Sequence, residues 1–326
     1  MPIIRSNIIK GPAMVTYRGQ KFFAKDDIQL STSLDTFNVE SSAHGKLDER
    51  VTARKVEVSF TPVGALTSAF INVLWPFSAM RLGRSIFHPP SYASPNAGAD
   101  FPLVINTLAG TVITLKSAAI TKMPDLELSS TKTSIGSVTF TGIGQDNTDW
   151  NDANNLMTIA SGAFTDADLG TLLLADIKTV GYKATWGAVD GFVAFNSSNG
   201  FKVSFDMAVK PIETDELGVV DMIFADLNVS ASCMPLGLTE AQLLAATGLQ
   251  EATTKRGGSL SAAGFDLVIS GYVSGDPQIT LTKSAIKQGG MAFGAATPRI
   301  GGTSFVATRN FTAGVPDPLF VIATVT

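Results

Sequence analysis

The chain has 326 residues, of which 45% are hydrophobic and only 16% are charged, and its formal net charge is −4 at pH 7. A typical soluble domain carries about 25% charged residues, so we expect neighbouring subunits to cover much of this surface; the alternative is a low-charge monomer. The mild charge and the lack of Lys/Arg runs longer than two argue against sequence-specific nucleic-acid binding. The single cysteine, Cys233, excludes an internal disulfide and a thiolate metal cluster.

The same features predict a protein that is made in a reducing cytoplasm. In the opening residues MPIIRSNIIKG, three polar residues interrupt the apolar run that a secretory signal peptide needs. The longest apolar stretches, such as 172–175, are far shorter than a membrane span. We therefore expect no membrane partner.

Most of the predicted elements are strands. Polar and apolar residues alternate at 55–60, as in a half-buried strand. Residues 103–115 form two β-rich runs around an Ala-Gly turn, which predicts a hairpin. Alternation returns at 137–143.

Two segments are predicted to be helical. The first is 62–75, where Leu66, Phe70, Val73 and Leu74 follow a helical spacing. The second is 237–249, which has a capping-box spacing near its start and a glycine where a helix would stop.

Several phrases of the sequence occur twice, in the same order. Their offsets of 173, 164, 166 and 165 differ little, which predicts an internal duplication of units at 11–143 and 181–310. After ITLKSAAI the chain continues TKMPD, whereas after ITLTKSAI it continues with a different, glycine-containing turn. We predict a first domain at 1–145, a linker at 146–178 and a second domain at 179–326. The repeated phrases are PVG (62–64) with PLG (235–237), LVI (103–105) with LVI (267–269), ITLKSAAI (113–120) with ITLTKSAI (279–286), and IGSVTF (135–140) with IGGTSF (300–305).

No segment carries a recognisable catalytic or metal-binding pattern. His44 and His88 lack metal-ligand spacing, and no G-x-S-x-G is present to hold a nucleophile. SSTK at 129–132 lacks companion motifs, and the acidic cluster at 146–152 fails the EF-hand pattern. The glycine pairs lack a P-loop lysine. We therefore predict no enzyme, no cofactor and no metal, and we expect the scattered aromatic residues to pack in the core.

Phrases in both halves resemble tail tube (major tail) proteins of long-tailed bacteriophages. This resemblance implies a mainly β fold with two tandem tube-like domains, each a pair of packed antiparallel sheets (β-sandwich or barrel) with one flanking helix. The resembling phrases are GPAMVTYRGQKFF (11–23), GKLDERVTARKVEVSFTPVG (45–64), VLWPF (73–77), TKMPDLELSSTKTSIGSVTFTGI (121–143), YKATWG (182–187), DELGVVDM (215–222), GLTEAQLLAA (237–246) and ATRNF (307–311).

The resemblance also implies partners and a location. Six tube domains surround a channel in the family's rings, so two-domain chains would form a trimeric ring with pseudo-sixfold symmetry. Rings would stack into a tube that contacts tape-measure, tail-terminator and tail-tip proteins. Double-stranded DNA would pass through without sequence-specific binding, so a neutral to acidic lining is expected. The protein would belong to the virion tail and assemble in the host bacterial cytoplasm.

The polar segment at 25–51 occupies the place where tube proteins carry a long loop or hairpin. We predict that Asp48, Glu49 and Arg50 form inter-ring or inter-subunit ion pairs; the alternative is a solvated turn. The second copy has Asp215 and Glu216 but lacks the arginine, so the two copies are expected to contact neighbours differently. An alternative function is a two-domain tail-tip, baseplate or adhesion module that binds sugars or receptors.

Overall fold

The computed structural model describes residues 13–64, 66–87, 101–130, 133–143, 156–162, 181–187, 194–214, 218–236, 264–290, 301–309, 311–312 and 315–325. These residues form antiparallel sheets with one short helix among them, which confirms the predicted mainly β class. Alternating burial along the strands, as at Val56, Val58 and Phe60, places one face of each sheet in the core. We call residues 13–162 the first half and residues 181–325 the second half.

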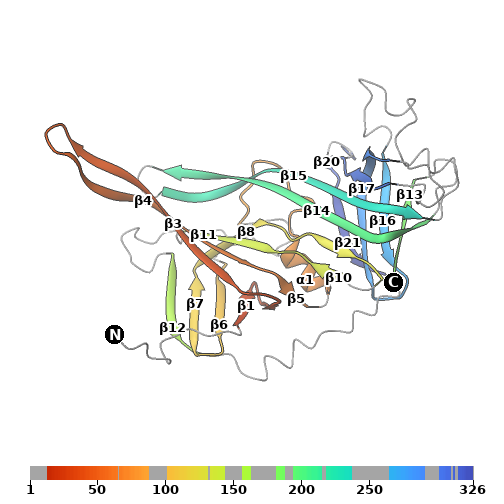
Figure 1. Ribbon diagram of the computed structural model, residues 1–326, viewed down its shortest axis with the longest axis horizontal. Coiled ribbons are helices and arrows are strands. Elements are labelled where there is room, and N and C mark those ends of the chain that lie inside the picture. The colour runs from red at the N-terminus through yellow and green to blue at the C-terminus, as the bar shows by residue number, and fades with distance from the viewer. Residues whose placement is uncertain are drawn as a thin grey trace.

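The first half consists of two packed sheets (Figure 1). One has the order β12-β7-β6-β1-β2-β5 and the other has the order β3-β4-β11-β8. The predicted hairpin at 103–115 is β6–β7, and the predicted strands at 55–60 and 137–143 are the end of β4 and β11. The strands of this half are β1 (Ala13–Tyr17), β2 (Gln20–Ala24), β3 (Gln29–Ser41), β4 (Gly45–Phe60), β5 (Pro62–Val63), β6 (Leu103–Thr107), β7 (Thr111–Leu115), β8 (Ser117–Lys122), β9 (Leu126–Leu128), β10 (Thr133–Ile135), β11 (Val138–Ile143) and β12 (Met157–Ser161).

The strands of the second half close on themselves. β14 pairs with both β13 and β15, so six strands form a circuit in the order β13-β16-β17-β18-β15-β14. Such closure removes free strand edges, as in a barrel. The strands are β13 (Tyr182–Trp186), β14 (Phe195–Thr214), β15 (Gly218–Leu236), β16 (Phe265–Gly271), β17 (Pro277–Gln288), β18 (Thr303–Val306), β19 (Phe311–Thr312), β20 (Val315–Pro316) and β21 (Phe320–Thr324).

The same strand pairings recur in the two halves. β1-β6-β7 pair in the first half as β13-β16-β17 do in the second, and β4-β11-β8 pair as β15-β18-β17 do. The registers correspond residue by residue, at the offsets found in the sequence. Corresponding pairs are Ile105/Ile113 with Ile269/Ile279, Leu103/Leu115 with Leu267/Leu281, and Ile120/Phe140 with Ile286/Phe305.

One buried hydrogen bond is also repeated. The Tyr17 hydroxyl in β1 donates to the carbonyl of Ala118 at 2.8 Å, and the Trp186 indole N–H in β13 donates to the carbonyl of Ser284 at 2.9 Å. Both rings are buried with their polar tips satisfied, as large amphipathic aromatic residues require. The corresponding ring contacts are Tyr17 with Phe140 (4.8 Å) and Trp186 with Phe305 (5.4 Å).

The first predicted helix is shorter than the sequence pattern indicates. Only α1 (Ser68–Leu74) is helical, because Pro62–Val63 forms strand β5 against β2. The hydroxyl of Thr67 accepts a hydrogen bond from the backbone N–H of Phe70 at 3.2 Å, and this N-cap fixes the start of the helix. The predicted helix at 237–249 lies outside the described residues.

The predicted linker contains a strand of the first half. β12 pairs with β7 at the edge of the first sheet, with Ile159 opposite Ile113. The rest of 146–178 apart from 156–162 lies outside the described residues. Buried residues of both halves form one contiguous cluster, so the two-domain division stays a prediction. Of the aromatic residues expected in the core, five belong to this cluster and Phe23 is only partly buried; the five are Phe22, Trp75, Phe77, Trp186 and Phe224.

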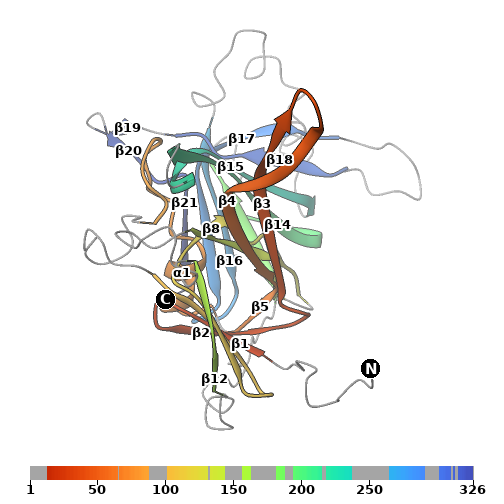
Figure 2. The same ribbon diagram turned by 90° about the vertical axis from the view of Figure 1, so that its left-hand side faces the viewer.

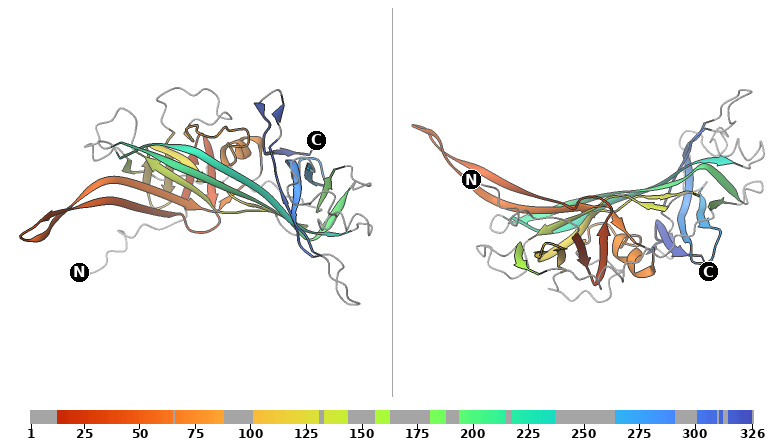
Figure 3. Two further views of the ribbon diagram at one scale, coloured as in Figure 1. Left: turned by 90° about the horizontal axis from the view of Figure 1, so that it is seen from above. Right: turned by 60° about the horizontal axis from the view of Figure 1, so that its bottom comes forward.

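The two halves share one curved layer. β14 and β15 run over the side of the first half that carries β8 and β11, and the shorter strands and α1 lie beneath this layer (Figure 3). Within this layer, β3 and β4 extend beyond the rest of the molecule (Figures 1 and 2).

Candidate assembly surface

The long hairpin of the first half, which we call the arm, comprises β3, β4 and their turn (residues 29–60). The far part of the arm stands clear of the body (Figures 1 and 2). Leu34, Phe37, Leu47 and Val51 on the arm are each 51% to 59% exposed. An isolated two-stranded hairpin is at best marginally stable in water, and exposed apolar side chains on such a hairpin suit a contact with another surface. The arm therefore has the character of a contact element.

The predicted contact residues lie near the tip of the arm. Asp48, Glu49 and Arg50 belong to strand β4 and are exposed, so they do not form the turn that the alternative reading required. The turn comprises residues 42–44 and contains the exposed His44. Asp215 and Glu216 lie outside the described residues, between β14 and β15. Asp48, Glu49 and Arg50 thus lie on the arm, and their role in contacts between subunits stays a prediction.

Local ion pairs already occupy the charges at the tip. Lys46 Nζ lies 2.7 Å from Glu49 Oε2, and the Thr36 hydroxyl donates a hydrogen bond to the same carboxylate. The hydrogen bond from Lys46 and then that from Thr36 hold the pKa of Glu49 below its usual value. Arg50 Nε is 4.0 Å from Asp48 Oδ2, and both side chains are mostly exposed. Exposed pairs of this kind contribute little to stability, so they are available to exchange partners.

The corresponding hairpin of the second half, β14–β15, is packed against the first half. Phe224 is fully buried and its ring stacks on Phe77 with centroids 5.7 Å apart. The backbone of β15 also pairs with residues 83–86, since Gly83 N donates to Phe224 O and Phe224 N donates to Arg84 O, both at 2.8 Å. One hairpin is therefore covered by the chain's own other half, whereas the arm is not.

A second contact between the halves, which we call the joint, adds a strand of the first half to the sheet of the second. β9 pairs with β14 with Leu126 opposite Val203 and Leu128 opposite Phe201. β10 pairs with β9 and extends this addition. Main-chain pairing of this kind gives strength, and the alternate side chains give specificity.

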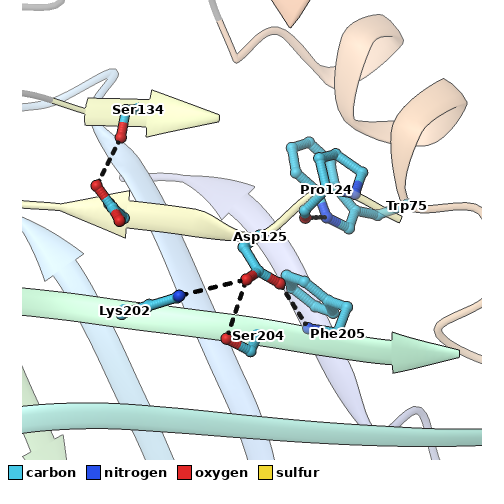
Figure 4. Close-up of polar contacts among 8 residues, drawn as sticks. Trp75, Pro124, Asp125, Ser134, Lys202, Ser204 and Phe205 are labelled. Atoms are coloured by element: carbon cyan, nitrogen blue, oxygen red, sulfur yellow. Dashed lines mark hydrogen bonds and ion pairs between the residues drawn. The ribbon is translucent and has the colours of Figure 1, made fainter. Parts of the chain in front are cut away.

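The Asp125 carboxylate forms polar contacts across the joint (Figure 4). It accepts hydrogen bonds from the Ser204 hydroxyl and the Phe205 backbone N–H, each at 3.2 Å, and Lys202 Nζ lies 3.6 Å away. Immediately before it, the Pro124 carbonyl accepts a hydrogen bond from the Trp75 indole N–H at 2.9 Å. Hydrogen bonds to a charged group are roughly twice as strong as neutral ones, so this carboxylate adds to the main-chain pairing between the halves.

Two further groups lie at the joint. The Tyr182 hydroxyl is 2.7 Å from the Thr133 hydroxyl, and burial raises the pKa of Tyr182 to about 12. Burial likewise raises the pKa of the Cys233 thiol to about 12, which leaves it neutral and unreactive at physiological pH. Beside Cys233 runs a cleft of about 430 Å³, lined by residues 127–129 of the first half and 199–202, 232–234 and 302 of the second.

The joint residues were missed by sequence reasoning, although TKMPD was noted as a place where the two copies differ. Of the segments considered for chemistry, His88 and 146–152 lie outside the described residues. Among the described residues, no three His, Cys, Asp or Glu side chains come together as a metal site. No described helix has the length and apolar character to span a membrane.

No protein-family model matches the chain, and no curated protein matches it. The structure itself must therefore supply the support for any function.

Proposed function

We propose that this chain is the structural subunit of a bacteriophage-type tail tube, in which three two-domain chains form each ring and rings stack around a channel. The observation that carries the proposal is the lateral repeat within the chain: the two halves share their strand pairings and registers. Within the chain, the second half lies beside the first and pairs with it through β9 and β14. The same side-by-side contact, repeated from chain to chain, would build a larger assembly. Repeating that contact gives a ring when the rotation between successive units closes after a whole number of steps.

The polar face of the β3-β4-β11-β8 sheet fits a channel lining. Ser31, Ser33, Glu57 and Thr139 share one face, opposite the buried residues of β4 and β11. Lys55 on this face lies 2.5 Å from Glu57, so its charge is neutralised. At these positions the hydroxyls and the paired Lys55 offer DNA phosphates no free cation, which suits a surface that DNA passes without being held.

The arm supplies the contact between stacked rings or neighbouring subunits. Its exposed apolar residues need a partner, and the packed β14–β15 hairpin shows how such a hairpin is covered in this fold. Asp48, Glu49 and Arg50 near its tip could exchange their local pairs for partners on another subunit. The proposed partners remain other copies of the chain, with tape-measure, terminator and tip proteins at the ends of the tube.

Negative-stain microscopy and sedimentation velocity of the purified full chain test the proposal. We expect rings and tubes, and a smallest assembled species of about three times 34.2 kDa. A protein that stays monomeric at high concentration would contradict the tube function. Discrete oligomers that never stack would favour the tail-tip or adhesion alternative instead.

A further inference from the structure

The arm and the β14–β15 hairpin correspond residue by residue. Opposed residues in β3 and β4 map onto opposed residues in β14 and β15 at a constant offset of 173, along the whole length of each hairpin. Each hairpin contains two register shifts, and these match as well. They follow Asp35 and Val39 in β3 and Ala208 and Ile212 in β14. A β-bulge redirects the side chains beyond it, so the matched bulges give both hairpins the same division of side chains between two faces.

One face of the arm continues the side of β4 that is buried in the core, and we call it the core-side face. Strand alternation places Leu30, Leu34 and Val51 on this face, in line with the buried Val56 and Val58. Leu30 is 37% exposed, and Leu34 and Val51 are each 53% exposed. The core-side face therefore passes from buried to exposed along the arm while it keeps apolar side chains.

The same face of the β14–β15 hairpin is covered by the first half. The counterpart of Val51 is Phe224, which is fully buried. The counterpart of Leu34 is Met207, which packs against the core. Residues 83–84 hydrogen-bond to the backbone of Phe224, whereas within the described residues β4 pairs at Val51 with β3 alone. Two hairpins of the same construction thus differ in whether their core-side face is covered.

The surface beside β14 also has a counterpart in the second half. β14 lies beside β8, and β8 pairs with β11. The end of β17 pairs with β18 in the same way, and among the described strands no other one pairs with Ala285–Gln288. This end of β17 and the arm lie toward opposite ends of the molecule (Figure 1). One copy can therefore present the end of β17 to the arm of the next.

We propose that the core-side face of the arm docks on the second half of a second copy of this chain, so that β3 lies beside the end of β17 as β14 lies beside β8. The inference rests on the proposed ring, and it makes the arm a lateral contact within a ring and not a contact between stacked rings. A first half cannot receive the arm, because its own β14–β15 hairpin already lies on it. Contacts between two different surfaces join copies head to tail, as a ring of identical chains requires.

The core-side face of the arm is more polar than its counterpart. Thr32 and Arg54 stand where the second hairpin has the buried Phe205 and Leu227. A continuous apolar stripe on a free hairpin would promote aggregation before assembly. Apolar residues separated by polar ones suit a face that stays in water until a second copy covers it.

Leu34→Asp tests this face on the full chain, and Ser33→Asp is the matched control because Ser33 precedes Leu34 on the opposite face. Both side chains are exposed, so both variants should fold, which circular dichroism checks. We expect Leu34→Asp to need at least about a hundred-fold more protein than wild type to assemble, and to sediment as a monomer below that concentration. Ser33→Asp should form rings and tubes like wild type.

The sedimentation outcomes separate this inference from the proposed function. Trimeric rings of Leu34→Asp that do not stack would overturn the inference, because the arm would then join rings and not chains within a ring. Assembly of Leu34→Asp at the wild-type concentration, or an equal loss in Ser33→Asp, would also overturn it. These results leave the tube function standing, whereas a wild-type chain that never assembles would contradict that function itself.

A photo-reactive side chain at position 34 identifies what covers the face. Leu34→p-benzoylphenylalanine is assembled from a mixture of isotope-labelled and unlabelled chains and then irradiated. We expect cross-linked peptides that join labelled to unlabelled chains, with the partner peptide drawn from residues 181–325. The same substitution at Ser33 is the control and should give no such product. Cross-links formed only within one chain, or to residues 13–162 of another, would overturn docking on a second half.

Discussion

The Asp125 carboxylate of the first half accepts a hydrogen bond from the backbone N–H of Phe205 in the second half at 3.2 Å. Asp125 directly precedes β9, the strand of the first half that pairs with β14 of the second half. One side chain therefore adds a hydrogen bond between the two halves beside the main-chain pairing of β9 with β14.

Replacing Asp125 with alanine is expected to lower the free energy of unfolding by about 1–3 kcal/mol, because a buried N–H and a hydroxyl lose a charged acceptor. Urea denaturation followed by circular dichroism measures this change. Asp206→Ala removes the same charge from an exposed position of β14 and should change stability by less than about 0.5 kcal/mol. If the two substitutions lower the free energy of unfolding equally, the hydrogen bonds of Asp125 across the joint do not stabilise the fold.

Strand alternation and repeated phrases allowed the fold class and the main hairpins to be predicted, because both depend on local periodicity. The alternation at 55–60 predicts a strand, and the Ala-Gly turn in 103–115 predicts a hairpin. Each pattern lies within a short stretch of chain. The helix at 62–75 was predicted too long because Pro62–Val63 pairs with β2, which is a tertiary contact that no local pattern reveals. Tertiary pairing of this kind overrides helix propensity.

The joint could not be predicted in the same way. Asp125 acts through Ser204 and Phe205, which lie 79 and 80 residues further along the chain, and only the fold brings them together. The one available signal was the difference between TKMPD and the turn that follows the second copy of the phrase. The position of the arm was predicted, but its exposed apolar side chains were not, because the composition of 25–51 is mostly polar.

The local ion pairs on the arm should make Glu49 titrate below its ordinary range. A lowered pKa in the folded state means that the pairing contributes fully above the unfolded pKa and is lost as pH falls through the folded pKa. Lys46→Ala removes the larger cause and should raise the pKa of Glu49 toward its ordinary value. Carboxyl carbon shifts in an NMR titration of the disassembled chain report this pKa directly. An unchanged pKa in the variant would show that Lys46 does not hold the carboxylate.

The exposed apolar side chains of the arm should matter for assembly and not for folding. Val51 is 53% exposed, so Val51→Asp is expected to change the free energy of unfolding by less than about 0.5 kcal/mol. Burying that aspartate in an interface without a partner costs several kcal/mol, so half-assembly should need at least about a hundred-fold more protein.

Val321→Asp alters a 46% exposed valine of β21, away from the arm, and is the matched control. Sedimentation velocity measures assembly and urea denaturation measures folding. If Val51→Asp assembles like wild type, the arm does not bury Val51 in the tube; if both variants fail equally, the loss reflects a general surface effect.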